Sequence, residues 1–185
     1  MLIDITLKIT PKMATDAQGN AKITLAGHLG THFDVMNKEF PLEYTSRKGI
    51  VFDVSSIRDR DIEAGDIDMS KVGKDMFVGF YTGYIHEYDY GTKEYFSTHP
   101  QLSDQLIDQL LEAGVSIIGV DCSGVRRGAQ HTPKDQYCAD RGVFIVENLY
   151  NLAAVVGKEN MIINTYPMSY ADMSGLPCRV IAQVL

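Results

Sequence analysis

An unbroken apolar run follows directly after an amphipathic helix, and this pair constrains the fold more than any other feature of the sequence. Between Ser103 and Ala113 the apolar residues recur on one helix face, Ser103 is a suitable N-cap, and Gly114 follows where helices commonly end. The next residues, Val115–Val120 (VSIIGV), are almost all apolar, which is typical of a strand buried on both faces. A buried strand directly after a helix predicts an α/β fold.

Further strands and one more helix complete this pattern. A second helix is expected over Lys134–Asp140, ended by Gly142. The helix-to-strand connections near the end of the chain are short, so we expect a mixed sheet with helices packed on it. No repeat and no Pro/Gly/Ser-rich linker is present, which indicates a single domain over residues 1–185. The remaining expected strands are Leu2–Ile9, Ala21–Ala26, Gly49–Val54, Met76–Thr82, Val143–Val146, Met161–Asn164 and Arg179–Val184.

Charge and composition narrow the classes of partner. The formal net charge is −7, which opposes binding to a phosphate backbone, so we expect no nucleic-acid partner. No window approaches the roughly 20 apolar residues of a membrane span, and no signal-peptide pattern begins the sequence, so we expect a cytoplasmic protein without a membrane partner. The three cysteines are widely spaced and form no CxxC pair, which indicates neither a disulfide framework nor a zinc knuckle.

Three potential metal ligands lie within seven residues of the segment GHLGTHFD. They are His28, His32 and Asp34. One helix face does not accommodate this spacing, and the two glycines argue against a helix, so we expect a loop running into a strand on which His32 and Asp34 point the same way. Three ligands on so short a segment leave coordination positions for water and substrate, as a catalytic metal requires. The other histidines have no such spacing, and we expect them to be structural or exposed: His86, His99 and His131.

The segment HLGTHFD resembles the HxGTHxD metal motif of the cyclase-like metal-dependent hydrolases. This family includes bacterial kynurenine formamidase and isatin hydrolase. Three further stretches are similar to the family, namely His99–Asp121, Asp135–Leu149 and Tyr166–Val184. The resemblance therefore covers most of the chain and is weak only from about Glu43 to Lys93.

The resemblance implies a single α/β domain of the swivelling β/β/α type, in a homodimer or higher homo-oligomer. It also implies one or two divalent ions, zinc or manganese, and hydrolysis of an amide, formamide or cyclic amide or ester bond in a small-molecule substrate by metal-activated water. His28, His32 and Asp34 fall on the first metal site, where Asp34 can bridge two ions. Glu147 falls on the glutamate ligand of the second metal site, and it could instead act as the catalytic base.

This sequence departs from the family pattern in two places. Met36 and Lys38 stand where the family has a proline and a histidine that acts as a proton shuttle, and Asp135 stands where it has a histidine ligand. Aspartate keeps a donor atom and favours a harder ion, manganese or magnesium over zinc. Lysine is a cation at pH 7 with its ordinary pKa of about 10.4, so Lys38 can stabilise an oxyanion, or act as a base only if its pKa is depressed.

Three classes of function therefore stay open. The first is a metal-dependent hydrolase acting on C–N bonds other than peptide bonds, in which Lys38 and Glu147 are the catalytic residues and Asp135 is a further metal ligand. The second is a metal-dependent protein that binds a small ligand on the same scaffold, with hydrolysis lost through the change at Lys38. The third is a structural metal site that stabilises an oligomer interface.

Overall fold

Eight strands form one mixed sheet in the computed structural model, which describes residues 1–185. The strand order is β1-β8-β2-β6-β5-β4-β3-β7, and β7 also pairs with β8. The seven strands from β8 to β7 therefore close into a barrel. Strand β1 lies outside this ring and pairs with β8, which also pairs with β2. Strands β3 to β6 are parallel to one another, and the remaining pairings are antiparallel. The strands are β1 (Leu2–Asp4), β2 (His32–Asp34), β3 (Ser46–Asp53), β4 (Phe77–Tyr81), β5 (Ile117–Val120), β6 (Phe144–Glu147), β7 (Met161–Pro167) and β8 (Gly175–Val184).

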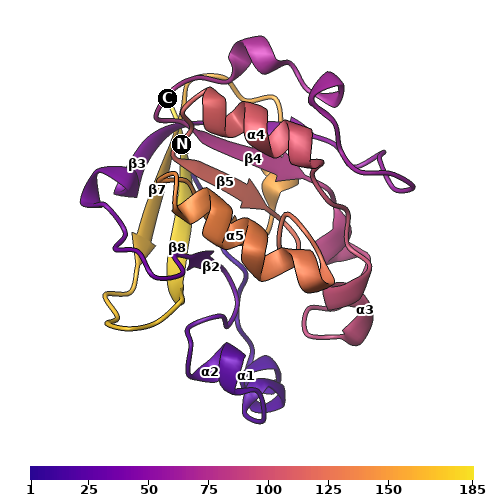
Figure 1. The fold of residues 1–185 in the computed structure, drawn as a ribbon, viewed down its shortest axis with the longest axis vertical. Helices are drawn as coiled ribbons and strands as arrows, with labels where there is room; N and C mark the ends of the chain where they lie inside the picture. The colour runs from indigo at the N-terminus through magenta and orange to yellow at the C-terminus, as the bar shows by residue number, and fades with distance from the viewer.

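Five α-helices and six short 3₁₀ helices accompany the sheet. Helices α4 and α5 lie side by side over one face of the sheet, whereas α1 and α2 project from the end of the molecule near β2 (Figure 1). No helix combines the length and the apolar run that crossing a bilayer requires. The α-helices are α1 (Pro11–Ala17), α2 (Ala21–Thr24), α3 (Lys93–Ser97), α4 (Asp104–Glu112) and α5 (His131–Ala139). The 3₁₀ helices are η1 (Leu42–Thr45), η2 (Ala64–Asp66), η3 (Met69–Lys71), η4 (Tyr84–His86), η5 (Gly128–Gln130) and η6 (Leu152–Ala154).

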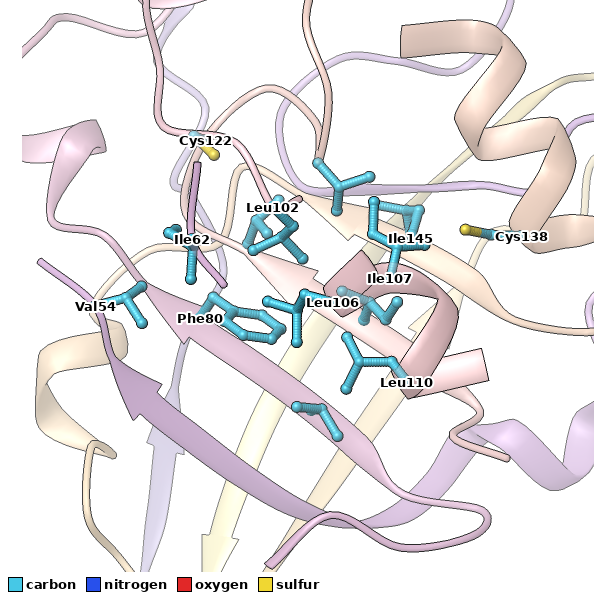
Figure 2. Packing of buried hydrophobic residues seen from close by; sticks show 14 of the residues in the cluster. Val54, Ile62, Phe80, Leu102, Leu106, Ile107, Leu110, Cys122, Cys138 and Ile145 are labelled. Atoms are coloured by element: carbon cyan, nitrogen blue, oxygen red, sulfur yellow. The ribbon is translucent and has the colours of Figure 1, made fainter. Parts of the chain in front are cut away.

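Alternating side chains on the parallel strands build two separate cores. Phe77 and Ile117 belong to the cluster inside the barrel, while the adjacent Val78 and Ile118 belong to the cluster under the helices. In the second cluster the apolar face of α4 meets the sheet, and Cys138 packs there from α5 (Figure 2). Because both faces of β4, β5 and β6 are buried, their sequences are nearly continuous apolar runs, as expected for parallel strands covered on both sides.

The structure confirms the α/β fold with a mixed sheet and packed helices, but it corrects individual elements. The strand expected over Ala21–Ala26 is wrong, because the segment is helix α2, whose first N–H groups are capped by the Asn20 side chain. The strand expected over Leu2–Ile9 is only β1, with one isolated bridge at Thr6. Helix α5 begins three residues earlier than expected, since Pro133 lies in its first turn, where a missing N–H costs nothing.

The barrel interior leaves no room for a side chain at Gly119. A Cβ there would lie 2.5 Å from Phe77 Cζ and 2.8 Å from Leu149 Cδ1, whereas a Cβ at Gly19 would meet nothing within 4 Å. We expect Gly119→Ala to lower the free energy of unfolding by about 1–3 kcal/mol through overpacking. Gly19→Ala is the matched control and should change it by less than about 0.5 kcal/mol. Urea denaturation measures both, and equal midpoints for the two variants would contradict the tight packing described here.

Candidate metal centre

Strand β2 places two of the expected metal ligands on one face. His32 and Asp34 are alternate residues of the strand and point out of the barrel, while Phe33 between them packs in the barrel interior. The antiparallel register with β6 sets His32 directly opposite Glu147, so their side chains share that face. His32 Nε2 lies 3.6 Å from Asp34 Oδ1 and 3.6 Å from Glu147 Oε2.

The loop before β2 brings His28 to the same point. His28 Nδ1 lies 3.0 Å from His32 Nε2 and 3.0 Å from Asp34 Oδ1. Gly27 lets this loop approach β8 closely, because a Cβ there would lie 2.0 Å from the Gly175 carbonyl oxygen, and its φ of +83° suits glycine. The trio expected from the sequence therefore converges as expected, from a loop and a strand.

The outer nitrogens of both imidazoles already have hydrogen-bond partners. The Gly30 carbonyl can only accept, so the nitrogen 2.9 Å away, His32 Nδ1, carries the hydrogen and Nε2 presents a lone pair to the cluster. Ser174 Oγ lies 2.9 Å from His28 Nε2, and when this hydroxyl oxygen accepts from Nε2–H, the Nδ1 lone pair of His28 faces the cluster, as metal binding requires. With metal–nitrogen bonds of about 2.0–2.1 Å, tetrahedral coordination separates two ligand nitrogens by roughly 3.3 Å, close to the spacing found.

A second group of ligands adjoins the first. His131 and Asp135 lie one turn apart on α5, with His131 Nε2 at 3.2 Å from Asp135 Oδ2 and 3.4 Å from Glu147 Oε1. One atom from each of these three residues and one from Asp34 lie within 4.8 Å of one another. Thus Asp135 and Glu147 do join the site, and Asp34 belongs to both groups.

His131 is the site residue that sequence reasoning missed. We expected it to be structural or exposed because it shows no ligand spacing outside a helix. Helix α5 begins at His131, three residues before the expected start, and this places His131 and Asp135 at i and i+4 on one helix face. The His131 ring packs against Gly124, where a Cβ would lie 2.6 Å from His131 Nδ1. Pro133 could have indicated the true start of α5, because proline is tolerated in the first turn of a helix and disfavoured later.

The carboxylates of this centre are buried without enough partners. Asp34, Asp135 and Glu147 each have a buried oxygen atom that makes no hydrogen bond, namely Asp34 Oδ2, Asp135 Oδ1 and Glu147 Oε1. Burial, followed by the charge of Asp34, raises the pKa of Glu147 and that of Asp135 well above their ordinary values. Burial would also raise the pKa of Asp34, but the neighbouring His32 and His28 outweigh it and lower that pKa. Such a site needs cations, so these residues fit a divalent metal ion.

Lys38 does not join the cluster. Its Nζ pairs with Asp140 Oδ1 at 2.7 Å, and its side chain is 37% exposed. It lines a different cavity, of about 840 Å³, between the segment after β2 and the β7–β8 connection. Met36, at the other position that departs from the family pattern, lies on the wall of both cavities and has a φ of +58°.

The candidate metal ligands line a cavity of about 450 Å³. Its wall is mostly polar, and Asn20 and Lys22 at the start of α2 contribute to it together with Ser123 and Thr132. The apolar part of the wall is small and consists of Ile23, Ala26, Met36 and Phe96. The segment between β1 and β2, which carries α1 and α2, therefore forms one side of this cavity.

Residues 3–126 match the sequence profile of a family described as putative cyclase. This chain belongs to the putative cyclase family. The match confirms the family that the resemblance indicated, and it covers the first group of ligands but ends before α5 and β6. A search of the curated proteins found no match to the sequence.

Solved structures share the fold of this cyclase-family chain. One is described as a potential metal-dependent hydrolase with cyclase activity, with a TM-score of 0.76, 20% identity, and coverage of 98% of this chain and 96% of that one. Isatin hydrolase A from Ralstonia solanacearum has a TM-score of 0.77 and 16% identity, over 98% of this chain and 91% of that one. Isatin hydrolase A from Labrenzia aggregata, bound to benzyl benzoate, has a TM-score of 0.73 and 18% identity, over 98% and 93%. At these identities the likeness concerns the fold.

The hydrogen bond between Ser174 and His28 gives a test of the centre that leaves every ligand in place. We expect Ser174→Ala to weaken divalent-metal binding about 10- to 100-fold, because partners that orient a ligating histidine have effects of this size. The backbone carbonyl of Ser174, which accepts from the N–H groups of Val35 and Met36, remains in the variant. Ser169→Ala is the control, since Ser169 lies in the same β7–β8 connection but lines the other cavity. Competition titration against a chromophoric chelator measures both variants, and unchanged affinity in Ser174→Ala would contradict this geometry.

Proposed function

We propose that this chain is a metal-dependent hydrolase that cleaves an amide, formamide, or cyclic amide or ester bond of a small molecule. The observation that carries the proposal is the convergence of three imidazoles and three buried carboxylates, with unpartnered carboxylate oxygens, at one cavity. Membership of the putative cyclase family supports it, as do the fold neighbours described as metal-dependent hydrolase and isatin hydrolase.

A divalent ion, when bound, would polarise a carbonyl group and lower the pKa of a water molecule from 15.7 toward about 7. His28, His32 and Asp34 would hold one ion, and Asp135 and Glu147 would contribute to a second. If the second ion is absent, Glu147 or Asp135 could instead accept a proton, because Glu147 Oε1 and Asp135 Oδ1 each lack a hydrogen-bond partner. We propose zinc or manganese as the metal, because imidazole suits zinc and carboxylates suit manganese.

The cavity supports a small substrate. Its volume of about 450 Å³ lies at the lower end of the usual range for ligand pockets, and its few apolar lining residues would contact one ring or short chain. Polar groups of the lining, from Ser123, Thr132 and Lys22, could hydrogen-bond a carbonyl or carboxylate of the substrate. We propose a compact substrate that carries both an apolar and a strongly polar group.

The position of Lys38 favours a second candidate function. Lys38 pairs with Asp140 and lines the other cavity, so its ammonium group does not lie beside the candidate metal ligands. The family's proton-shuttle histidine is thus absent at position 38, and the lysine does not replace its function. Such a chain fits a protein that binds a small ligand through its metal without hydrolysing it. Glu147 then remains the catalytic candidate that separates the two functions.

A homodimer or higher homo-oligomer is part of the same proposal. Exposed large apolar side chains gather around the 840 Å³ cavity, where they would be covered by another chain: Leu42, Tyr166, Met168 and Tyr170. Light scattering coupled to size-exclusion chromatography measures the mass directly, and a purely monomeric protein would contradict this part of the proposal.

Metal content tests the first step of the proposed function. We expect protein purified without a metal-affinity tag to carry one or more divalent ions per chain, and the His28→Ala/His32→Ala double variant to lose at least one of them. His86→Ala is the control, since the His86 ring packs at a tilted angle against Tyr150 and does not line the cavity. Elemental analysis gives the ion count, and full occupancy in the double variant would rule out these two ligands.

An activity screen separates the hydrolase from the binding protein. The metal-free protein, reloaded with manganese or zinc, should hydrolyse at least one compound among formyl-aryl amines, cyclic imides and lactones. Glu147→Gln should then reduce kcat at least about 100-fold, since general-base catalysis contributes 10²–10⁴-fold. Lys38→His should change the rate less than about threefold if hydrolysis needs no group at this position. Saturable ligand binding without turnover, together with a gain of activity in Lys38→His, would favour the binding protein.

A further inference from the structure

The two halves of the metal centre offer different ligand atoms. The first half supplies two imidazole nitrogens and one carboxylate oxygen, from His28, His32 and Asp34. The second half supplies one imidazole nitrogen, from His131, and carboxylate oxygens from Asp135, Glu147 and Asp34. The first half is rich in nitrogen and the second is rich in oxygen.

The buried unpartnered oxygens lie in the carboxylate-rich half. Asp135 Oδ1 and Glu147 Oε1 make no hydrogen bond, and neither does Asp34 Oδ2, which belongs to the residue shared by both halves. By contrast, Asp34 Oδ1 already faces His28 and His32 in the first half. The side chains of these three acidic residues are 2–3% exposed, so water does not compensate for the missing partners.

One divalent ion in the first half would leave the second half without a cation. Asp135 Oδ1 and Glu147 Oε1 are buried there and make no hydrogen bond. One ligand atom each from His131, Asp135, Glu147 and Asp34 lie within 4.8 Å of one another, which suits a single ion. A second divalent ion between His131, Asp135 and Glu147 would give these oxygens the partner that they lack.

We propose that the two halves select different ions: the half formed by His28, His32 and Asp34 prefers zinc, and the half formed by His131, Asp135, Glu147 and Asp34 prefers manganese. This inference rests on the proposed metal-dependent function and specifies the metal pair. His131 is a metal ligand in it, one helical turn before the aspartate that replaces a histidine in this sequence. Imidazole donors suit zinc, whereas carboxylate donors suit manganese, so the donor sets themselves predict the difference.

The preference is a ratio of affinities, because zinc binds most nitrogen and oxygen sites more tightly than manganese does. We expect the ratio of the zinc affinity to the manganese affinity to be at least about tenfold smaller in the carboxylate-rich half. Zinc supplied at one equivalent per chain should therefore fill the nitrogen-rich half, and manganese in excess should fill the other.

The test loads metal-free protein with one equivalent of zinc and an excess of manganese, followed by desalting. Elemental analysis and the electron paramagnetic resonance signal of bound manganese give the content of each ion. Wild type should retain about one zinc and one manganese per chain. His131→Gln should lose the manganese and keep the zinc, His28→Gln should lose the zinc or weaken it at least about tenfold, and His86→Gln should behave as wild type.

The outcomes separate this inference from the proposed function. Loss of the same ion in both ligand variants, or unchanged manganese affinity in His131→Gln, would overturn the inference but not the proposed function. Failure of wild type to bind any divalent ion would overturn the proposed function itself.

A second experiment needs no variant, so it decides the question even if a substitution prevents folding. Wild-type protein already loaded with one zinc per chain is titrated with manganese. A single manganese site per chain supports the inference, and displacement of zinc by manganese contradicts it.

Discussion

A three-residue strand is the constraint on which the rest of the structure depends. Strand β2 pairs with β6 on one side and β8 on the other, and all three of its residues are buried. Its central residue, Phe33, packs in the barrel interior, and its outer residues, His32 and Asp34, place candidate metal ligands on the opposite face. A shift of one residue in the register would move Phe33 out of the core and both ligands into it, so the same pairing that closes the barrel also fixes the centre.

Helix α5 brings two further candidate ligands to the site that β2 and β6 form. Helix α5 packs on the sheet through Cys138 and Ala139, and its first two turns carry His131 and Asp135 to the end of β6 where Glu147 lies. The carboxyl groups buried there are unfavourable for the folded metal-free chain, because they lose their hydration and some of their oxygens have no hydrogen-bond partner. A bound cation offsets this loss, and so the geometry that binds metal and the stability of the fold are linked.

Sequence reasoning succeeded where a local pattern determines the structure. The apolar run before Asp121 and the capped helix at Ser103 both lie where expected, because burial on two faces and N-capping leave direct marks in the sequence. The trio of His28, His32 and Asp34 was also found, since its ligands are adjacent in the chain. The position of Lys38 was not, because it depends on which way the chain turns after β2, and the positive φ of Met36 at that turn is unusual for a methionine. His131 was missed for a similar reason, as its role depends on where α5 begins.

The helical region between β1 and β2 lines the cavity but supplies none of the candidate metal ligands. Helices α1 and α2 contribute wall residues such as Asn20, Lys22 and Ile23 but none of the metal ligands, and they project from the body of the molecule (Figure 1). Their side chains are mostly exposed and take no part in closing the barrel. Substitutions at the exposed wall residues of this segment should therefore cost little in folding, while the register of β2 keeps His32 and Asp34 in place at the other end of the cavity.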